Sequence, residues 1–283
     1  MISSSAFDRA SPARRVRAVA LAASFVVVGS PVRAETGDAL DASKLQLTFE
    51  DRFDRLDISR RGAGTRWSAH TPWDGDFGDA RFADPGAAGP FFAGPGGLVI
   101  EARKQDSGEW TAGLIASVDP EGRGFGQRYG YFEVRAKLPP GPGVWPAFWL
   151  DSYVGKSSPD PSLEIDVLEY YGAFPGAYHS VVTLWPSANE PEKRSTDHIH
   201  MVPSGSLSAD FHSYGALVEP DWIVIYRDRR EVWRTPTPAE HRHKLMILID
   251  LALGGGWPIA ATPSPSRMEV EYVRAYSIAN LPE

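Results

Sequence analysis

Three acidic residues interrupt an apolar segment near the middle of the 283-residue chain. Residues 163–169 read Leu-Glu-Ile-Asp-Val-Leu-Glu, which places the acids at Glu164, Asp166 and Glu169. Apolar strands seldom carry acids without a reason, because burying an unpaired charge is costly. Two carboxyl groups beside a sugar can cleave a glycosidic bond, one as the nucleophile and the other first as an acid and then as a base. The segment therefore indicates carboxylate chemistry.

The spacing of these acids predicts an irregular strand. Side chains two residues apart share a face, as Glu164 and Asp166 do, whereas Glu169 follows Glu164 at an odd offset of five. One inserted residue, a β-bulge at Val167 and Leu168, returns all three acids to one face. The outer carboxyl groups can then approach the separation of about 5–5.5 Å that is typical of retaining glycosidases. Spacing alone leaves two other interpretations open: solvated acids on a half-exposed strand, and a site for Ca²⁺ or Mg²⁺.

The surrounding sequence favours strands over helices. Residues 131–137 and 268–272 alternate between apolar and polar side chains, as half-buried antiparallel strands do. Residues 222–227 and 244–251 are apolar runs of the length of buried strands. Clusters of glycine and proline separate these segments, and no amphipathic helix is evident. We predict an all-β fold, a sandwich of two stacked, curved antiparallel sheets.

The first 34 residues differ in composition from the rest. Four arginines precede an apolar stretch at 19–29, and small residues up to Ala34 suit a cleavage site. We expect a signal peptide at residues 1–34, one domain at residues 35–283, and a secreted or periplasmic protein. The later sequence holds no run of the roughly 18 apolar residues that a transmembrane helix needs.

Charge and cysteine content exclude several classes of partner. Residues 35–283 carry 24 basic and 35 acidic residues, a formal charge of −11. This balance argues against nucleic acid and anionic membranes as partners. The chain has no cysteine, which excludes disulfides and removes the favoured ligand of structural zinc. We expect a monomer.

Further segments occur in a fixed order around the acids. Residues 129–139 and 143–150 precede them, and residues 211–215, 253–258 and 270–276 follow. With the pattern Glu-Ile-Asp-Val-Leu-Glu at 164–169, these segments resemble glycoside hydrolase family 16. The match is to the subgroup with a bulged catalytic strand, which includes laminarinases and bacterial exopolysaccharide β-glycanases.

The resemblance implies a concanavalin A-like β-jelly roll whose concave sheet binds a polysaccharide. It implies that Glu164 is the nucleophile, Asp166 the assisting carboxylate and Glu169 the acid/base. The expected activity is retaining endo-hydrolysis of a β-linked polysaccharide, either a β-1,3/1,4-glucan or a bacterial exopolysaccharide. A transglycosylase of the same family and a non-catalytic, lectin-like jelly roll are the alternatives. The intact acid trio favours an enzyme, because sugar binding does not require it.

Aromatic residues are expected at such a site, because sugar rings stack on aromatic faces. Trp145 and Trp149 are four residues apart and so share one face of a strand. Trp73 and Trp257 lie in glycine-rich loops. We expect these four tryptophans to contact the substrate. His179 is the candidate for a histidine that relatives carry on the strand after the catalytic one.

No cofactor is expected. Many relatives have Asp-Glu-Phe in the first strand and an aspartate in the last, at positions linked to a structural calcium. This chain has Asp51-Arg52-Phe53 and Glu271 at these positions, which argues against calcium.

Two histidine pairs have a spacing seen in metal sites. His198 and His200 form one pair, and His241 and His243 form the other. Neither pair has an acid pair near it in the sequence. We therefore predict that these histidines lie on the surface and bind no metal.

Overall fold

The computed structural model describes residues 37–279, apart from residues 63, 74, 95 and 154–157. These residues form 17 strands, one short helix, α1 (Ser206–Ala209), and a 3-10 turn at Ala42–Lys44. They belong to one compact unit. None of the helices described is long and apolar enough to cross a bilayer. The signal peptide predicted at residues 1–34 lies outside the described residues.

The strands range from 2 to 13 residues, and segments rich in glycine and proline separate many of them, as the sequence predicts. Their bounds are β1 Leu45–Asp51, β2 Ile58–Ser59, β3 Trp67–Ala69, β4 Arg81–Phe82, β5 Phe91–Gly94, β6 Gly97–Lys104, β7 Trp110–Ala116, β8 Gly130–Lys137, β9 Val144–Ser152, β10 Ser162–Glu169, β11 Ala177–Trp185, β12 Arg194–Met201, β13 His212–Val218, β14 Trp222–Arg227, β15 Arg230–Pro236, β16 Leu245–Leu253 and β17 Ser266–Ile278.

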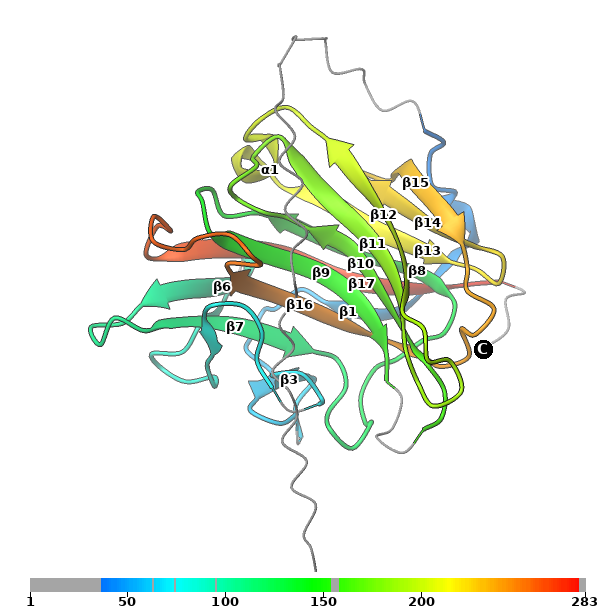
Figure 1. Cartoon of the computed structure of the whole chain (residues 1–283), viewed down its shortest axis with the longest axis horizontal. Coiled ribbons are helices and arrows are strands. Elements are labelled where there is room, and N and C mark those ends of the chain that lie inside the picture. Colours follow the sequence, from blue (N-terminus) through cyan, green and yellow to red (C-terminus); the bar gives the residue numbers. More distant parts are fainter. Residues whose placement is uncertain (1–36, 63, 74, 95, 154–157, 280–283) are drawn as a thin grey trace, which may run out of the picture. The chain divides into compact units, whose positions relative to one another are not determined.

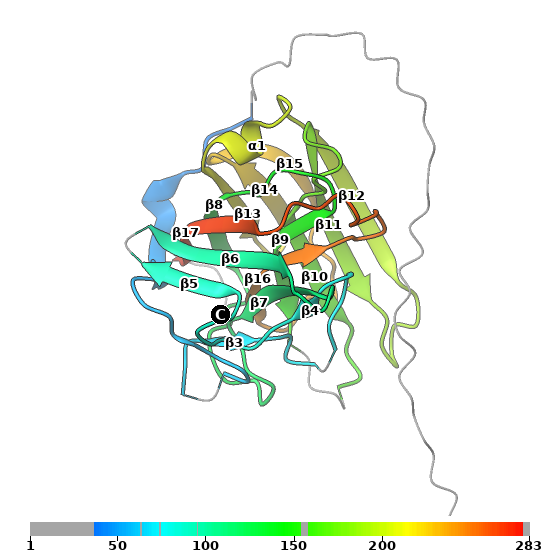
Figure 2. The same ribbon diagram turned by 90° about the vertical axis from the view of Figure 1, so that its left-hand side faces the viewer.

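Most of these strands build two antiparallel sheets. In the first sheet the order is β15-β14-β13-β8-β17, and the long strand β17 also pairs with β6 and β1 (Figure 2). In the second sheet the order is β12-β11-β10-β9-β16-β7-β3-β2 (Figure 1). The exceptions to antiparallel pairing are β2 with β3 and β4 with β7. The predicted sandwich of curved, largely antiparallel sheets is confirmed.

Alternate residues of the strands fill the core between the sheets. Ile165 and Ile247 in the second sheet, and Phe132 and Val134 in the first, are fully buried. Because side chains alternate in a strand, the residues between them point to the opposite face of each sheet. The face of each sheet that points away from the core can therefore carry polar groups, and both sheets have polar groups there.

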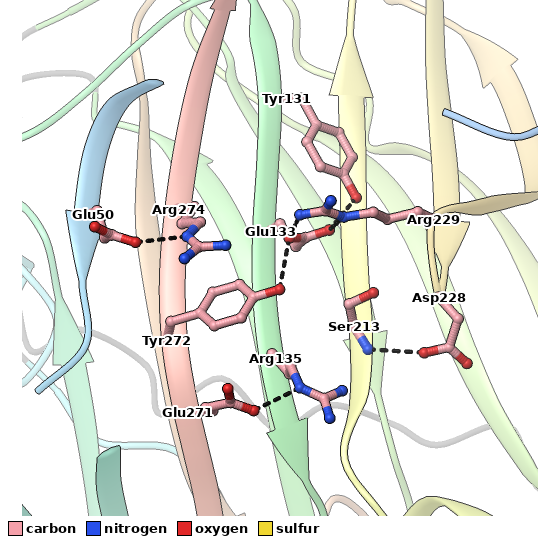
Figure 3. Close-up of polar contacts among 10 residues, drawn as sticks. All are labelled: Glu50, Tyr131, Glu133, Arg135, Ser213, Asp228, Arg229, Glu271, Tyr272 and Arg274. Carbon is pink, nitrogen blue, oxygen red and sulfur yellow. Dashed lines mark hydrogen bonds and ion pairs between the residues drawn. The ribbon is translucent and has the colours of Figure 1, made fainter. Parts of the chain in front are cut away.

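The first sheet carries a polar cluster around Glu133, drawn in Figure 3. Glu133 is fully buried, and its two carboxylate oxygens accept hydrogen bonds from the Arg229 guanidinium at 2.8 and 2.9 Å. The hydroxyls of Tyr131 and Tyr272 donate to the same carboxylate at 2.8 and 3.0 Å. Gly215 on β13 makes room for this arrangement, since a Cβ there would lie 2.2 Å from the Tyr131 hydroxyl oxygen.

The prediction of surface positions is wrong for two of the four paired histidines. His200 and His241 are only 5% and 3% exposed. His200 points inward from β12 and stacks on the Tyr178 ring, with ring centroids 4.4 Å apart. Burial lowers the pKa of His200 to about 3 and that of His241 to about 4, so both are neutral.

Candidate active site

The three acids of β10 lie on one face of the second sheet. Between Asp166 and Glu169, β10 advances three residues while both neighbouring strands advance only two. Val167 and Leu168 are both fully buried at this irregularity. The predicted bulge is therefore confirmed, and it returns Glu169 to the face that bears Glu164 and Asp166. We call this face, with those three acids, the acid face.

A side chain from the next strand stabilises the bulge. A bulge disrupts the regular ladder and leaves backbone groups without their usual partners. The Ser180 hydroxyl, fully buried on β11, donates to the Val167 carbonyl oxygen at 2.8 Å. His200 Nε2 lies 3.0 Å from the Ser180 oxygen. Since the Ser180 proton is already used, neutral His200 donates its Nε2 proton to Ser180.

Each outer acid accepts a hydrogen bond from a tryptophan indole. Trp185 Nε1 donates to Glu164 Oε2 at 3.0 Å, and Trp145 Nε1 donates to Glu169 Oε1 at 3.0 Å. Glu169 Oε1 also accepts the Tyr171 hydroxyl at 2.7 Å. These donors are uncharged, so they orient the two carboxyl groups without neutralising them.

Asp166 sits between the outer acids in a surrounding that disfavours its charge. It keeps some exposure on the acid face, but protein atoms surround most of it. Burial raises the pKa of Asp166 well above its ordinary value, and the charges of Glu164 and Glu169 raise it further. Asp166 therefore keeps its proton to a higher pH than an exposed aspartate does.

Another acid, Asp250, lies on the same sheet two strands from Glu169. Asp250 is 1% exposed, and both it and Glu169 pair with Ala147 on the intervening strand β9. Trp149 Nε1 donates to Asp250 Oδ1 at 2.8 Å, and the Ala252 amide donates to Oδ2 at 3.1 Å. Burial raises the pKa of Asp250 to about 8 despite these two donors.

The predicted aromatic residues are distributed unevenly over this face. Trp145 is half-buried beside Glu169 and stacks on Tyr171, with ring centroids 6.0 Å apart. Trp149 is only 6% exposed, because Trp73 and Phe77 pack against its edge at 6.2 and 6.1 Å. Of the two β9 tryptophans, Trp145 is thus the one with more surface for a ligand.

His179 and Trp257 occupy different surroundings. His179 is paired with Glu169 across β10 and β11, and it meets the Tyr171 ring edge-on at 5.5 Å. Trp257 lies in the loop after β16, is 39% exposed, and packs on Phe174 at 4.7 Å. The structure therefore brings Trp145 and His179 to the acids and places Trp257 farther along the loop.

The residues at this site that sequence reasoning missed include Tyr171, Ser180, Trp185 and Asp250. Asp250 had a usable signal, because it is the single polar residue in an otherwise apolar strand. The other three carry no such mark. A tyrosine, a serine and a tryptophan on neighbouring strands gain a role only from the register that brings them to the acids.

The positions linked to calcium in relatives are engaged with other partners. Asp51 accepts the Trp67 indole N–H and the Phe53 amide, both at 2.8 Å. Glu271 accepts a 2.6 Å hydrogen bond from Arg135. In the part of the chain that the structure describes, no group of three or more acids or histidines is arranged to hold a metal ion. These residues do not fit a calcium site.

Known proteins resemble this chain over much of its length. The chain is 30% identical over 263 residues to an endo-1,3-1,4-beta-glycanase of Rhizobium meliloti. This alignment covers 85% of this chain and 53% of that protein. It is 28% identical over 211 residues to a beta-glucanase of Rhodothermus marinus. This second alignment covers 65% of this chain and 68% of that protein. The chain thus spans about half the length of the Rhizobium relative.

A solved structure shares the fold. The laminarinase catalytic domain of Thermotoga maritima superposes with a TM-score of 0.65 at 24% identity, covering 84% of this chain and all of that domain. The family model for glycosyl hydrolases family 16 matches residues 97–273, which include the three acids and most strands of both sheets. The chain therefore belongs to glycosyl hydrolases family 16.

Proposed function

We propose that this protein is a secreted endo-β-glycanase that cleaves internal bonds of a β-linked polysaccharide and retains the anomeric configuration. One observation carries the proposal: the bulge in β10 places Glu164, Asp166 and Glu169 on one face. Sugar binding alone would need neither this irregular strand nor three acids side by side. The names of the relatives, endo-1,3-1,4-beta-glycanase and beta-glucanase, support the same activity.

The first half-reaction would form a covalent intermediate. A carboxylate oxygen of Glu164 attacks the anomeric carbon, and the bond from that carbon to the leaving oxygen breaks with its electron pair on the oxygen. Glu169 donates its proton to this oxygen, so the sugar chain leaves as an alcohol. Asp166, which lies between these two acids, would be the assisting carboxylate.

The second half-reaction would reverse these roles. Glu169, now a carboxylate, takes a proton from a water molecule whose oxygen attacks the anomeric carbon. The bond to Glu164 breaks, and its electron pair returns to the carboxylate. Two inversions at one carbon restore the original configuration.

The substrate we propose is a β-1,3/1,4-glucan, with a bacterial exopolysaccharide as the second candidate. Half-buried Trp145 and nearby His179 flank Glu169 and would contact sugars next to the cleaved bond. The arginine-rich, apolar composition of residues 1–34 supports export, and we propose that the exported enzyme acts as a monomer.

A reducing-end assay on β-1,3-, β-1,4- and mixed-linkage glucans, galactans and bacterial exopolysaccharides tests the activity. We expect new reducing ends with one class, and NMR of early products should show the β-anomer. Release of the α-anomer would refute retention, and binding without cleavage would favour a lectin. Transfer products longer than the substrate would indicate a transglycosylase.

Two variants test the roles of the outer acids. Glu164→Ala should abolish turnover of every substrate. Glu169→Ala should still form the intermediate from aryl glycosides whose leaving group needs no proton. Added azide should then rescue the two variants with opposite product anomers. Equal loss by both variants on natural and activated substrates would contradict the assignment.

A further inference from the structure

We propose that Tyr171 is a positioning residue for Glu169, a role that rests on the proposed acid/base function of that glutamate. Its hydroxyl and the Trp145 indole together occupy Glu169 Oε1. They thereby make Oε2 the oxygen that gives a proton to the leaving group and later takes one from water.

The hydrogen bonds on Glu169 carry this proposal. A carboxyl oxygen offers two lone-pair positions in its plane. Oε1 accepts Tyr171 at 2.7 Å and Trp145 at 3.0 Å, so both positions are used. A proton on Oε1 would displace one of these donors, whereas a proton on Oε2 displaces neither. The two donors thus select Oε2 as the reactive oxygen.

The backbone holds Tyr171 in this position. β10 continues its pairing with β9 beyond Glu169, since the amides of Tyr170 and Gly172 donate to the Pro146 and Val144 carbonyls at 3.1 and 2.9 Å. Residues 169 and 171 therefore point the same way, as alternate residues of an extended strand do. Tyr170, between them, is buried at 1% exposure.

The loop after β16 fixes the two donor rings against each other. Gly255 lies beside both rings: a Cβ there would be 2.7 Å from Trp145 Cδ2 and 2.7 Å from Tyr171 Cε1. Gly255 also has a φ of +61°, which favours glycine. His179 meets the Tyr171 ring from another side. The hydroxyl of Tyr171 is thus held by packing on several sides of its ring.

Tyr171→Phe tests the proposal, because it deletes one oxygen and leaves the stacked ring in place. On the polysaccharide, where the leaving group needs a proton, we expect kcat/KM to fall about tenfold, the equivalent of one hydrogen bond. On a dinitrophenyl glycoside of the same sugar chain, kcat/KM for glycosylation should stay within about twofold of wild type, since that leaving group needs no proton. A series of aryl leaving groups should therefore show a steeper dependence on leaving-group acidity in the variant.

Tyr170→Phe is the matched control, because it removes the hydroxyl of the adjacent, core-facing tyrosine. It should leave the leaving-group dependence unchanged. Gly255→Ala provides a second route to the same defect, because it pushes the two rings apart, and it should reproduce the selective loss.

Other outcomes would overturn the inference. Equal losses on both substrate types in Tyr171→Phe would make Tyr171 a packing residue, and no loss at all would show that Trp145 holds Oε1 without it. If Glu169→Ala shows the same leaving-group dependence as wild type, the acid/base assignment itself fails, and the role of Tyr171 fails with it.

Discussion

Both sheets bury carboxyl groups, but the partners of these groups differ in charge. On the first sheet, Glu133 is held by the Arg229 guanidinium and two tyrosine hydroxyls (Figure 3). On the acid face, Glu169 and Asp250 are held by uncharged indole, phenol and amide donors. The first arrangement pairs a carboxylate with a cation, whereas the second orients carboxyl groups without one.

The electrostatic consequences follow this division. The Glu133 carboxylate raises the pKa of the Arg229 guanidinium above its already high value, which strengthens a permanent ion pair. On the acid face, burial and neighbouring acids raise the pKa of Asp166, and burial raises that of Asp250 to about 8. Carboxyl groups with raised pKa values therefore lie on the acid face, as is typical of a catalytic site.

Among the variants that separate the two sheets, Asp166→Asn should have the largest effect. The change should lower kcat by about 10²–10⁴-fold, the range seen for groups that assist acid–base chemistry. It should also move the alkaline limb of kcat/KM to lower pH. In the variant, fewer neighbouring negative charges hold the last proton of the cluster, so this proton is lost at lower pH. A pH profile measures both.

Glu133→Gln provides the contrast for Asp166→Asn. It removes an acid from the other sheet and should leave the pH profile unchanged. An alkaline limb that stays in place or moves upward in Asp166→Asn would show that Asp166 is not coupled to the outer acids.

Asp250→Asn should change how stability depends on pH. The folded state binds this proton more tightly than the unfolded state, since the pKa is about 8 against an ordinary 3.8. The contribution of Asp250 to the free energy of unfolding is thus largest below about pH 4, and it falls as the pH rises to about 8, by an amount of order 5 kcal/mol. The variant lacks this contribution. Its free energy of unfolding, measured by urea unfolding, should therefore rise relative to that of the wild type through that pH range. Parallel pH curves would contradict the buried, protonated state of Asp250.

Arg229→Ala should destabilise the fold without affecting catalysis. It leaves the buried Glu133 carboxylate without its cation, which costs about 3–5 kcal/mol for a fully buried pair. The Arg229 side chain is 42% exposed, so water replaces part of the lost interaction and we expect about 2–3 kcal/mol. Arg234→Ala, which breaks the surface pair with Glu231, is the control and should cost below about 0.5 kcal/mol. A fall in kcat per folded molecule in Arg229→Ala would mean that the two faces are coupled.

Trp145→Phe should have the smallest effect. It keeps an aromatic ring beside Tyr171 but removes the indole N–H from Glu169, which should cost about 1 kcal/mol in kcat/KM. Trp222→Phe, on an exposed tryptophan of β14, should change nothing measurable. An unaltered kcat/KM in Trp145→Phe would show that the indole hydrogen bond does not contribute.

The sequence allowed the strands and the bulge to be predicted because both depend on local patterns. Alternation located β8 and β17, apolar runs located β14 and β16, and the odd offset of Glu169 required one extra residue. The burial of His200 was not predictable in this way, since all the remaining residues of β12 are exposed and the strand shows no alternation. Its inward position depends on Tyr178 and Ser180, which another strand supplies.

The contacts of the acids were harder to predict from the sequence than the acids themselves. Trp149 shares a face with Trp145, as predicted, but Trp73 and Phe77 from a distant loop cover it. Asp250 lies in a run that is typical of a hydrophobic core, and Trp185 reaches Glu164 only through the register of β11. These features depend on tertiary packing, which the local pattern does not encode. The roles of the acids stay predictions until the variants are measured.

The bulge also changes what an insertion or deletion would do to this strand. Removing one residue from an ordinary strand turns every later side chain to the opposite face. Deleting residue 167 or 168 would instead leave Glu164, Asp166 and Glu169 at even spacing and in step with the flanking strands β9 and β11. Both lengths of this segment keep the acids pointing the same way. We therefore expect this strand to tolerate the loss of one residue at Val167 or Leu168, whose buried side chains do not line the acid face.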